Sequence, residues 1–305
     1  MPLFRTYAAY LRERYGARAV RICVDAGLGC PHRRSPRGGC IFCRGSGSVD
    51  APPVTRQIDD ELMRLRDAGP LPELLLYFQA GCSTNAPVKR LRELYDAALG
   101  RASFRELILA TRPDCIDEER AELIASYLRP DRDVWVELGL QSALDRTLRA
   151  VGRGHDVAAF RRAFIMLRSR GIKVAAHLIF GLPGESMADL RRSMGILAAL
   201  EPQGVKIHNL HVCRGTPLGE LFLRGEVTAP STASHLRAVR EALELLPPKT
   251  LVMRLTTDTP RAELLAPARF ADKAAFRRLL EESMLRAGTR QGRLYPGSPP
   301  GRAPR

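Results

Sequence analysis

Three cysteines that lie close together carry the strongest chemical signal in this chain. Cys30, Cys40 and Cys43 fall in one loop-like run that follows a short apolar stretch. Iron–sulfur clusters and structural zinc sites ordinarily take four protein ligands, so three thiols leave one metal position open to a molecule that is not protein. Gly38 and Gly39, just before Cys40, give the backbone freedom to wrap around a cluster. The run therefore indicates a metal centre built for chemistry.

A structural zinc site is the alternative that any two cysteines with this short spacing leave open. It needs a fourth ligand, and Cys23 and His32 are the nearest candidates. Cys23 falls in the apolar-alternating stretch 19–24, where a small thiol packed in the core is the simpler interpretation. His32 is expected to face solvent or to support the metal ligands. The remaining cysteines are far apart in the sequence and indicate no second metal site: Cys82, Cys115 and Cys213.

The cysteine loop must be positioned by the β-rich runs and amphipathic helical patterns that alternate through most of the chain. Strands are predicted at 20–24, 74–78, 107–110, 134–138, 174–180 and 205–211, and helices at 58–65, 88–99, 118–128, 157–170 and 187–200. Ser186 and Asp189 have the spacing of a helix-capping box. Six strand-then-helix units favour parallel strands with right-handed crossovers. The predicted fold is α/β, a partial (β/α)6 TIM-type barrel over residues 1–215 with its cluster loop at 30–43.

The pattern changes beyond residue 215. A helix at 234–246, a short strand at 251–255 and a helix at 273–287 predict a C-terminal α+β extension, residues 216–292, that closes the side of the barrel. Residues 293–305 are rich in Pro and Gly and poor in apolar side chains, which predicts a disordered basic tail.

Polar residues gather where the predicted strands end, and active sites of β/α barrels form at such strand ends. The motifs are Thr111-Arg-Pro-Asp114, Glu137-Leu-Gly-Leu-Gln-Ser142, Arg153-Gly-His155 and His177-Leu-Ile-Phe-Gly-Leu-Pro-Gly-Glu185. Together with the cysteine spacing they resemble the radical S-adenosylmethionine (SAM) superfamily, specifically its bacterial YhcC/YtqA-type branch related to the catalytic subunit of Elongator. The resemblance runs from Cys30 to about Gly292. It implies the same barrel fold, a [4Fe-4S] cluster on Cys30, Cys40 and Cys43, and SAM cleaved at the open iron to a 5′-deoxyadenosyl radical.

The same resemblance implies which residues meet SAM. Gln79, Ala80 and Gly81 stand where the family contacts the methionine end of SAM. The polar surfaces of SAM are implied to be lined by Glu137, Gln141 and Arg153. Acidic and amide side chains can bind the amine and hydroxyls of SAM, and an arginine can pair with its carboxylate. Gly181 is expected to let the backbone approach adenine.

Several of these positions also have a simpler structural interpretation. Glu137 can be a strand residue neutralised by a nearby arginine, although an acid between two apolar residues is costly to bury without a purpose. Gly181 can serve a strand-to-helix turn. The catalytic residue is left unknown, with Cys82, Cys213 and His177 as candidates. The two cysteines are candidate hydrogen-atom donors or ordinary buried thiols, and His177 can be a hydrogen-bonded core residue.

The chain is strongly basic, with 48 Lys and Arg against 33 Asp and Glu and a net charge of +15. Nine arginines lie within residues 1–44, around the cluster loop in the sequence, and another group lies within 277–305. Such a charge attracts polyanions and favours RNA as a partner, with a solvated basic surface as the alternative. Aromatic residues make up 6% of the chain, too few for a broad base-stacking surface but enough for one flipped nucleotide.

The sequence therefore predicts a cytoplasmic radical SAM enzyme, and the likeness to the Elongator branch points to tRNA, through the side chain of a wobble uridine. An electron donor such as flavodoxin or ferredoxin is expected to reduce the cluster. The absence of a disulfide framework and of a secretory signal favours a reducing compartment, and no stretch approaches the roughly 18 apolar residues of a membrane helix. Two alternatives stay open: a radical SAM enzyme acting on a small metabolite, and a non-enzymatic iron–sulfur or zinc RNA-binding protein.

Overall fold

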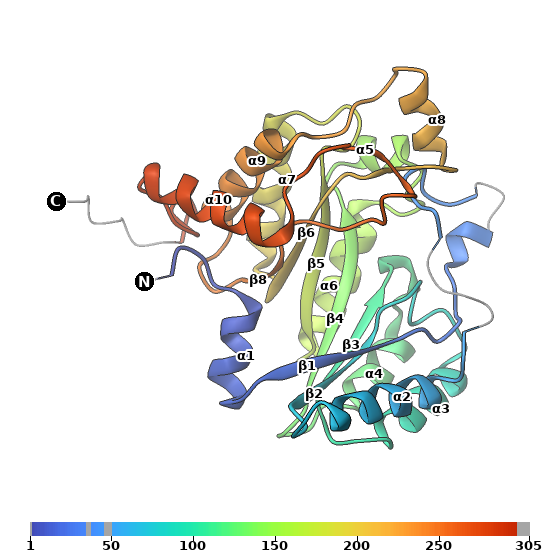
Figure 1. The fold of residues 1–305 in the computed structure, drawn as a ribbon. Helices are drawn as coiled ribbons and strands as arrows, with labels where there is room; N and C mark the ends of the chain where they lie inside the picture. The colour runs from blue at the N-terminus through green and yellow to red at the C-terminus, as the bar shows by residue number, and fades with distance from the viewer. Residues whose placement is uncertain (1, 35–37, 46–50, 298–305) are drawn as a thin grey trace.

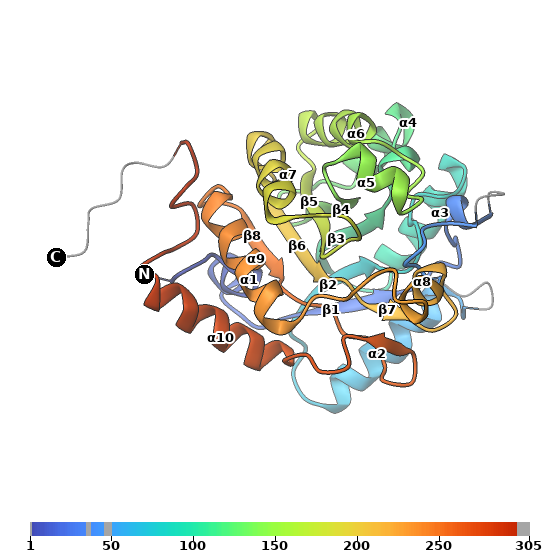
Figure 2. The same ribbon diagram turned by 90° about the horizontal axis from the view of Figure 1, so that it is seen from above.

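A curved parallel sheet forms the centre of the computed structural model, which describes residues 2–34, 38–45 and 51–297. Its seven strands follow the order β1-β2-β3-β4-β5-β6-β8, and helices lie outside the curve (Figure 1, Figure 2). The strands are β1 (Ala19–Val24), β2 (Glu73–Phe78), β3 (Phe104–Thr111), β4 (Asp133–Gln141), β5 (Lys173–Phe180), β6 (Gly204–Asn209) and β8 (Leu251–Arg254). The predicted α/β fold with an open, partial barrel is confirmed.

The helices that connect the strands follow the pattern of the sequence. They are α2 (Val54–Asp67), α3 (Val88–Leu99), α4 (Glu118–Ala125), α5 (Asp145–Ala150), α6 (Val157–Ser169) and α7 (Met187–Leu200), with short 3-10 turns at Pro31–Arg34 and Pro113–Cys115. The predicted capping box is present at the start of α7, where the Ser186 and Asp189 side chains each accept the other's backbone N–H. None of the helices among the described residues is long and apolar enough to cross a bilayer.

Strand side chains alternate between two apolar layers. The outer face of the sheet packs against the helices through residues such as Ile22 and Val136. The inner face is filled near the strand starts by a second cluster that includes Leu75, Ile108 and Trp135. Helix α1 (Tyr7–Tyr15), which the sequence did not predict, supplies Tyr7 and Leu11 to that cluster. The lower end of the half-barrel is therefore closed by an apolar plug.

The segment predicted as a C-terminal extension contributes a strand to the central sheet, because β8 pairs in parallel with β6. The predicted strand 205–211 is divided into β6 and a short β7 (Val212–Cys213), which pairs antiparallel with β9 (Leu264–Ala266). Helices α8 (Pro217–Leu223), α9 (Thr232–Leu245) and α10 (Lys273–Arg286) complete the segment. Within the predicted disordered tail, Tyr295 hydrogen bonds to Glu201, and residues 298–305 lie outside the described part of the chain.

Candidate active site

A cavity of about 280 Å³ lies at the ends of the central strands. Its walls come from the cysteine loop and from β2, β3, β4, β5, β6 and β8. All three predicted metal ligands line it: Cys30, Cys40 and Cys43. The predicted SAM-binding and catalytic residues that line it are Gln79, Gly81, Glu137, Gln141, Arg153 and His177. The fold thus brings most of the sequence-predicted site together.

The cysteine loop is held in place by backbone contacts with its neighbours. The N–H of Cys82 donates to the carbonyl oxygen of Gly29 at 2.8 Å, and the N–H of Ile41 donates to that of Val151 at 3.0 Å. Gly81 has a φ of +66°, and a Cβ at this position would lie 2.5 Å from the Gly29 oxygen. A glycine is therefore needed where β2 ends against the start of the loop.

Of the two alternative metal ligands, His32 also lines this cavity and Cys23 does not. Nε2 of His32 is 2.5 Å from the carbonyl oxygen of Gly152, so the imidazole packs on the turn that carries Arg153. The expectation that Cys23 is a core thiol is wrong, since it is exposed. It lies on an edge strand, and the alternation of β1 buries its neighbours Ile22 and Val24 instead. Among the described residues, no three His, Cys, Asp or Glu side chains are grouped to hold a single metal ion.

The end of β4 adopts an unusual backbone conformation. Gln141 has a φ of +74°, which non-glycine residues rarely adopt, and the pairing with β5 shifts between Gly139 and Gln141. Arg153 packs there, donating from Nη2 to the Gly139 carbonyl oxygen at 2.7 Å, with Nη1 3.8 Å from Sγ of Cys40. Nε of this buried arginine has no hydrogen-bond partner in the part of the chain described. A guanidinium able to receive an anion therefore lies beside a predicted cluster ligand, Cys40.

Glu137 is the centre of a buried charge network deeper in the cavity. Its Oε2 accepts hydrogen bonds from Nζ of Lys206 and the hydroxyl of Tyr77, and lies 3.0 Å from Nε2 of His177. Burial would raise the pKa of Glu137, but Lys206 and His177 outweigh it and hold the pKa well below its ordinary value. Burial lowers the pKa of Lys206 to about 8, against the opposing effect of Glu137.

The partner of Glu137 differs from the expected one. The simpler interpretation of Glu137, as a strand residue, expects a nearby arginine to neutralise it. The ion pair is instead made by Lys206, which the sequence did not single out as a site residue. The available signal was a lysine inside the apolar run Val205–Ile207. Oε1 of Glu137 has no hydrogen-bond partner among the residues described, so one oxygen of the carboxylate is left for a ligand.

Two histidines share the wall of the cavity opposite the cysteine loop. The rings of His177 and His208 lie 5.6 Å apart, and both line the cavity. Burial lowers the pKa of each, so both are neutral near pH 7. Of the three catalytic candidates, His177 is the one placed on the cavity wall.

The other two candidates lie away from the cavity wall as the described residues form it. Cys82 is fully buried, with Sγ 3.1 Å from Oγ1 of Thr111, and a hydrogen bond from Cys115 lowers its pKa to about 6. Cys213 is buried in β7. These positions agree with the ordinary interpretation of both as packed thiols.

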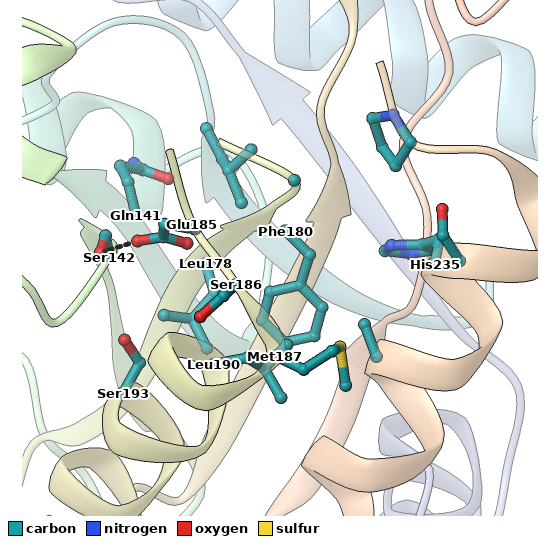
Figure 3. A pocket seen from close by; sticks show the side chains of 15 residues that line it. Gln141, Ser142, Leu178, Phe180, Glu185, Ser186, Met187, Leu190, Ser193 and His235 are labelled. Carbon is teal, nitrogen blue, oxygen red and sulfur yellow. Dashed lines mark hydrogen bonds between the residues drawn. The ribbon is translucent and has the colours of Figure 1, made fainter. Parts of the chain in front are cut away.

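A smaller crevice of about 170 Å³ lies between α7 and α9, beyond the ends of β4 and β5 (Figure 3). Gly181 lines this crevice and not the main cavity, and Ala80 lines neither. A Cβ at Gly181, where φ is +88°, would lie 2.9 Å from Cγ of Pro230, so the turn itself requires glycine. Gln141 lines both spaces and connects them, while Ser142 hydrogen bonds to Glu185 on the crevice side.

Only some of the N-terminal arginines lie at the cluster loop, where Arg33 lines the cavity, whereas those of α1 lie away from it. Helix α1, with the exposed Arg12, packs near the strand starts, because its Arg14 pairs with Asp133, the first residue of β4. Arg37 lies outside the described residues. Exposed arginines also occur in segments that follow strand ends: Arg33, which lines the cavity, Arg149 and Arg214.

Comparisons with known proteins give the family. The model of the Radical SAM superfamily matches residues 26–196, and that of the Radical_SAM C-terminal domain matches residues 202–286. Uncharacterized protein MJ0486 of Methanocaldococcus jannaschii is 34% identical over 301 residues, which cover 96% of this chain and 92% of that protein. Protein YhcC of Escherichia coli is 33% identical over 268 residues, 87% of each chain.

A solved structure agrees in fold. The archaeal Methanocaldococcus infernus Elp3 with an N-terminal deletion matches with a TM-score of 0.69 at 20% sequence identity, over 90% of this chain and 63% of that one. The family model covers more than half of the chain, and the two relatives align along most of their length. The chain therefore belongs to the radical SAM superfamily, in the YhcC-type branch, and its cofactors are a [4Fe-4S] cluster and SAM.

Proposed function

We propose that this radical SAM enzyme modifies tRNA, with the cluster on Cys30, Cys40 and Cys43 and with SAM in the cavity beside it. The observation that carries the proposal is that all three thiols open into the same cavity as the strand-end polar groups. The donor set fits the cofactors. Three thiolates leave one iron for SAM, and Nε of Arg153, a buried polar atom without a partner in the described part of the chain, remains to be satisfied.

Each cavity residue has a role that its chemistry supports. When bound, the cluster supplies an electron and SAM supplies the radical group that abstracts hydrogen from the substrate. Arg153 suits the carboxylate of SAM because its guanidinium is buried next to Cys40. Gln79 and Gln141 offer amide groups for the amine and hydroxyls. Glu137 lies deeper, with Oε2 occupied by Lys206 and Tyr77, and we do not assign it to SAM.

The closed lower end of the barrel protects the chemistry. The plug formed by α1 and the inner-face apolar cluster excludes water from below. Phe42, between two of the cysteine ligands, lines the cavity near the cluster loop. A reactive radical needs such enclosure because water and exposed side chains would otherwise compete with the substrate.

The choice of tRNA rests on the likeness to the Elongator branch and on the exposed arginines that follow strand ends. Arg33, Arg149 and Arg214 form no ion pair within the described residues. They can contact phosphates while one nucleotide, for which we propose a wobble uridine, enters the cavity. The enzyme needs a reductant, for which we propose a flavodoxin or ferredoxin, and we place the protein in the cytoplasm.

The first test combines SAM cleavage with tRNA analysis. The anaerobically reconstituted protein, given dithionite and SAM, is expected to form 5′-deoxyadenosine. Mass spectrometry of tRNA nucleosides from cells with and without the gene is expected to reveal a missing uridine modification. If 5′-deoxyadenosine forms and tRNA is unchanged, the substrate is a small metabolite.

A second test uses the position of the arginines. Replacing Arg149 and Arg214 with Gln should weaken tRNA binding and reduce the salt dependence of the affinity by about one unit of slope for each lost phosphate contact. The matched control is the double variant Arg12→Gln/Arg18→Gln, which removes two exposed arginines at the far end of the barrel. Equal losses in both double variants would favour diffuse attraction over a defined tRNA surface.

A further inference from the structure

The floor of the cavity lies one layer below the groups we assign to SAM. On β4, Glu137 comes two residues before Gly139, whose carbonyl oxygen holds Arg153. Two strand residues span about 7 Å, so the Glu137 network is that much further from the cysteine loop. Lys206 pairs in register with Arg254 on β8, so both contribute to the same part of the wall. Below this layer is the apolar plug.

Positive charge exceeds negative charge in this floor. Lys206 and Arg254 line the cavity together with a single carboxylate, that of Glu137. Arg21 lies behind Tyr77, with its guanidinium 5.4 Å from the ring centre, and adds a third cation. The ion pair between Lys206 and Glu137 cancels one positive charge. Two positive charges therefore remain unbalanced beside an enclosed space.

Several polar atoms of the floor are also unsatisfied. In the part of the chain described, Oε1 of Glu137, Nε2 of His208 and Nη2 of Arg21 have no hydrogen-bond partner, and Arg254 makes no ion pair. Glu137 is only 1% exposed, so solvent is a poor substitute for a partner. Buried polar groups are ordinarily paired, because each unpaired one costs free energy. A cavity arginine without an ion pair, Arg254, near an unpaired carboxylate oxygen indicates a ligand that bears an anion and a hydrogen-bond donor.

We infer that this floor, formed by Arg254, His208 and Lys206 around Glu137, binds a small co-substrate that carries a carboxylate or phosphate next to a hydroxyl or ammonium group. The anion pairs with Arg254, assisted by the positive field of Lys206 and Arg21. The neighbouring donor reaches Oε1 of Glu137. The inference rests on the proposed function in one respect: SAM is taken to sit above the floor and to leave it free.

The test measures anion binding without turnover. The reconstituted protein, with an oxidised cluster and saturating SAM but no reductant, is titrated calorimetrically with glycolate, acetate or inorganic phosphate. Glycolate carries both required groups, acetate lacks the donor, and phosphate represents a phosphoryl source. We expect glycolate to bind more tightly than acetate. If phosphate binds more tightly than glycolate, the anionic group of the natural ligand is a phosphoryl group.

Variants separate the floor from general charge effects. Arg254→Gln should weaken glycolate binding about tenfold to a hundredfold, the loss expected for one charge-assisted hydrogen bond, and Arg254→Lys should retain part of the affinity. Arg237→Gln removes an exposed arginine of α9 and should change nothing. Unchanged cluster absorbance and SAM affinity in Arg254→Gln will show that the variant is folded.

Two results would overturn the inference. One is the absence of binding by all three anions in the SAM-loaded protein. The other is equal weakening by Arg237→Gln and Arg254→Gln. Because the titration needs neither reductant nor tRNA, its failure leaves SAM cleavage and tRNA modification untouched. Conversely, failure of SAM cleavage would not alter the titration.

Discussion

Two groups of charges lie on the inner face of the same sheet, one partly exposed near the strand starts and one buried in the cavity floor, and they differ in how completely they are paired. Near the strand starts, Glu106 accepts hydrogen bonds on both oxygens, from the hydroxyls of Tyr7 and Tyr15. Asp133 likewise uses both oxygens, with partners Lys173, Arg14 and Tyr10. Asp133 is thus paired with two cations, and both oxygens of Glu106 have hydrogen-bond partners. In the cavity floor, one carboxylate faces three cations, and Oε1 of Glu137 has no partner within the described chain.

This difference in pairing distinguishes charges that support the fold from charges that are available to a ligand. Charges that only support a fold are expected to satisfy one another, since an unmatched buried charge is costly. The lower group meets that expectation and fastens α1 to the sheet. The charges of the cavity floor do not meet that expectation. They border a cavity that three thiols also line, and a ligand in this cavity can supply the missing partners.

The largest expected effect comes from removing a cluster ligand. Cys40→Ala should abolish 5′-deoxyadenosine formation and cluster assembly while leaving the far end of the barrel folded, because the paired charges there are untouched. Cys23→Ala, which removes an exposed thiol outside the cluster loop, should retain both properties. Iron content and product formation check the pair. Normal iron content in Cys40→Ala would contradict the assigned ligand set.

The next prediction compares two ion pairs, Lys206 with Glu137 and Lys173 with Asp133. Lys206→Met removes the direct ion-pair partner of the buried Glu137 carboxylate, which keeps the hydrogen bonds of Tyr77 and His177, and should reduce the free energy of unfolding by about 3–5 kcal/mol. Lys173→Met should cost less, because Asp133 keeps Arg14 and Tyr10 as partners. Urea denaturation of both variants measures the difference. Equal losses of unfolding free energy in the two variants would mean that Glu137 and Asp133 are paired equally well.

A pH effect is expected from the lower group. Burial raises the pKa of Glu106 from 4.5 to about 7, so between those values the folded protein keeps a proton that the unfolded chain has lost. This stabilisation is complete below about pH 4.5 and disappears as the pH rises to about 7, a total of about 3 kcal/mol. Glu106→Gln should remove that pH dependence. If the free energies of unfolding of wild type and variant change equally with pH between 5 and 8, Glu106 does not cause this pH dependence.

The smallest effect concerns the glycines that follow strands. Gly184→Ala should cost about 1 kcal/mol, from its positive φ alone, because nothing lies within 4 Å of the added Cβ. Gly81→Ala adds a contact of 2.5 Å with the Gly29 oxygen and should cost more and lower iron binding. Thermal unfolding and iron analysis compare the two. Indistinguishable variants would show that the cysteine loop tolerates displacement from β2.

Much of the fold could be predicted because strands buried on both faces read as continuous apolar runs. The bounds of α3 and α7 were predicted to the residue, and six strands were placed within a few positions. Helix α1 was missed because its apolar residues are aromatic and interspersed with charges. The role of β8 could not be read locally, since its pairing with β6 depends on how far the sheet curls.

The site could be predicted where it depends on the spacing of residues in the sequence, and less well where it depends on how side chains pack. The three cysteines and Arg153 line the same cavity, as expected from their motifs. Lys206 and Arg254 were missed because single basic residues in short strands do not reveal which face they occupy. Gly181 lines a different crevice, since its conformation is set by contact with Pro230.

The most direct test of the central claim is electron paramagnetic resonance of the anaerobically reconstituted, reduced protein before and after SAM is added, with metal analysis of the same sample. Our account predicts about four iron atoms per chain and a cluster signal that shifts when SAM binds, because one iron lacks a protein ligand. A protein that holds zinc, or a cluster signal indifferent to SAM, would contradict it.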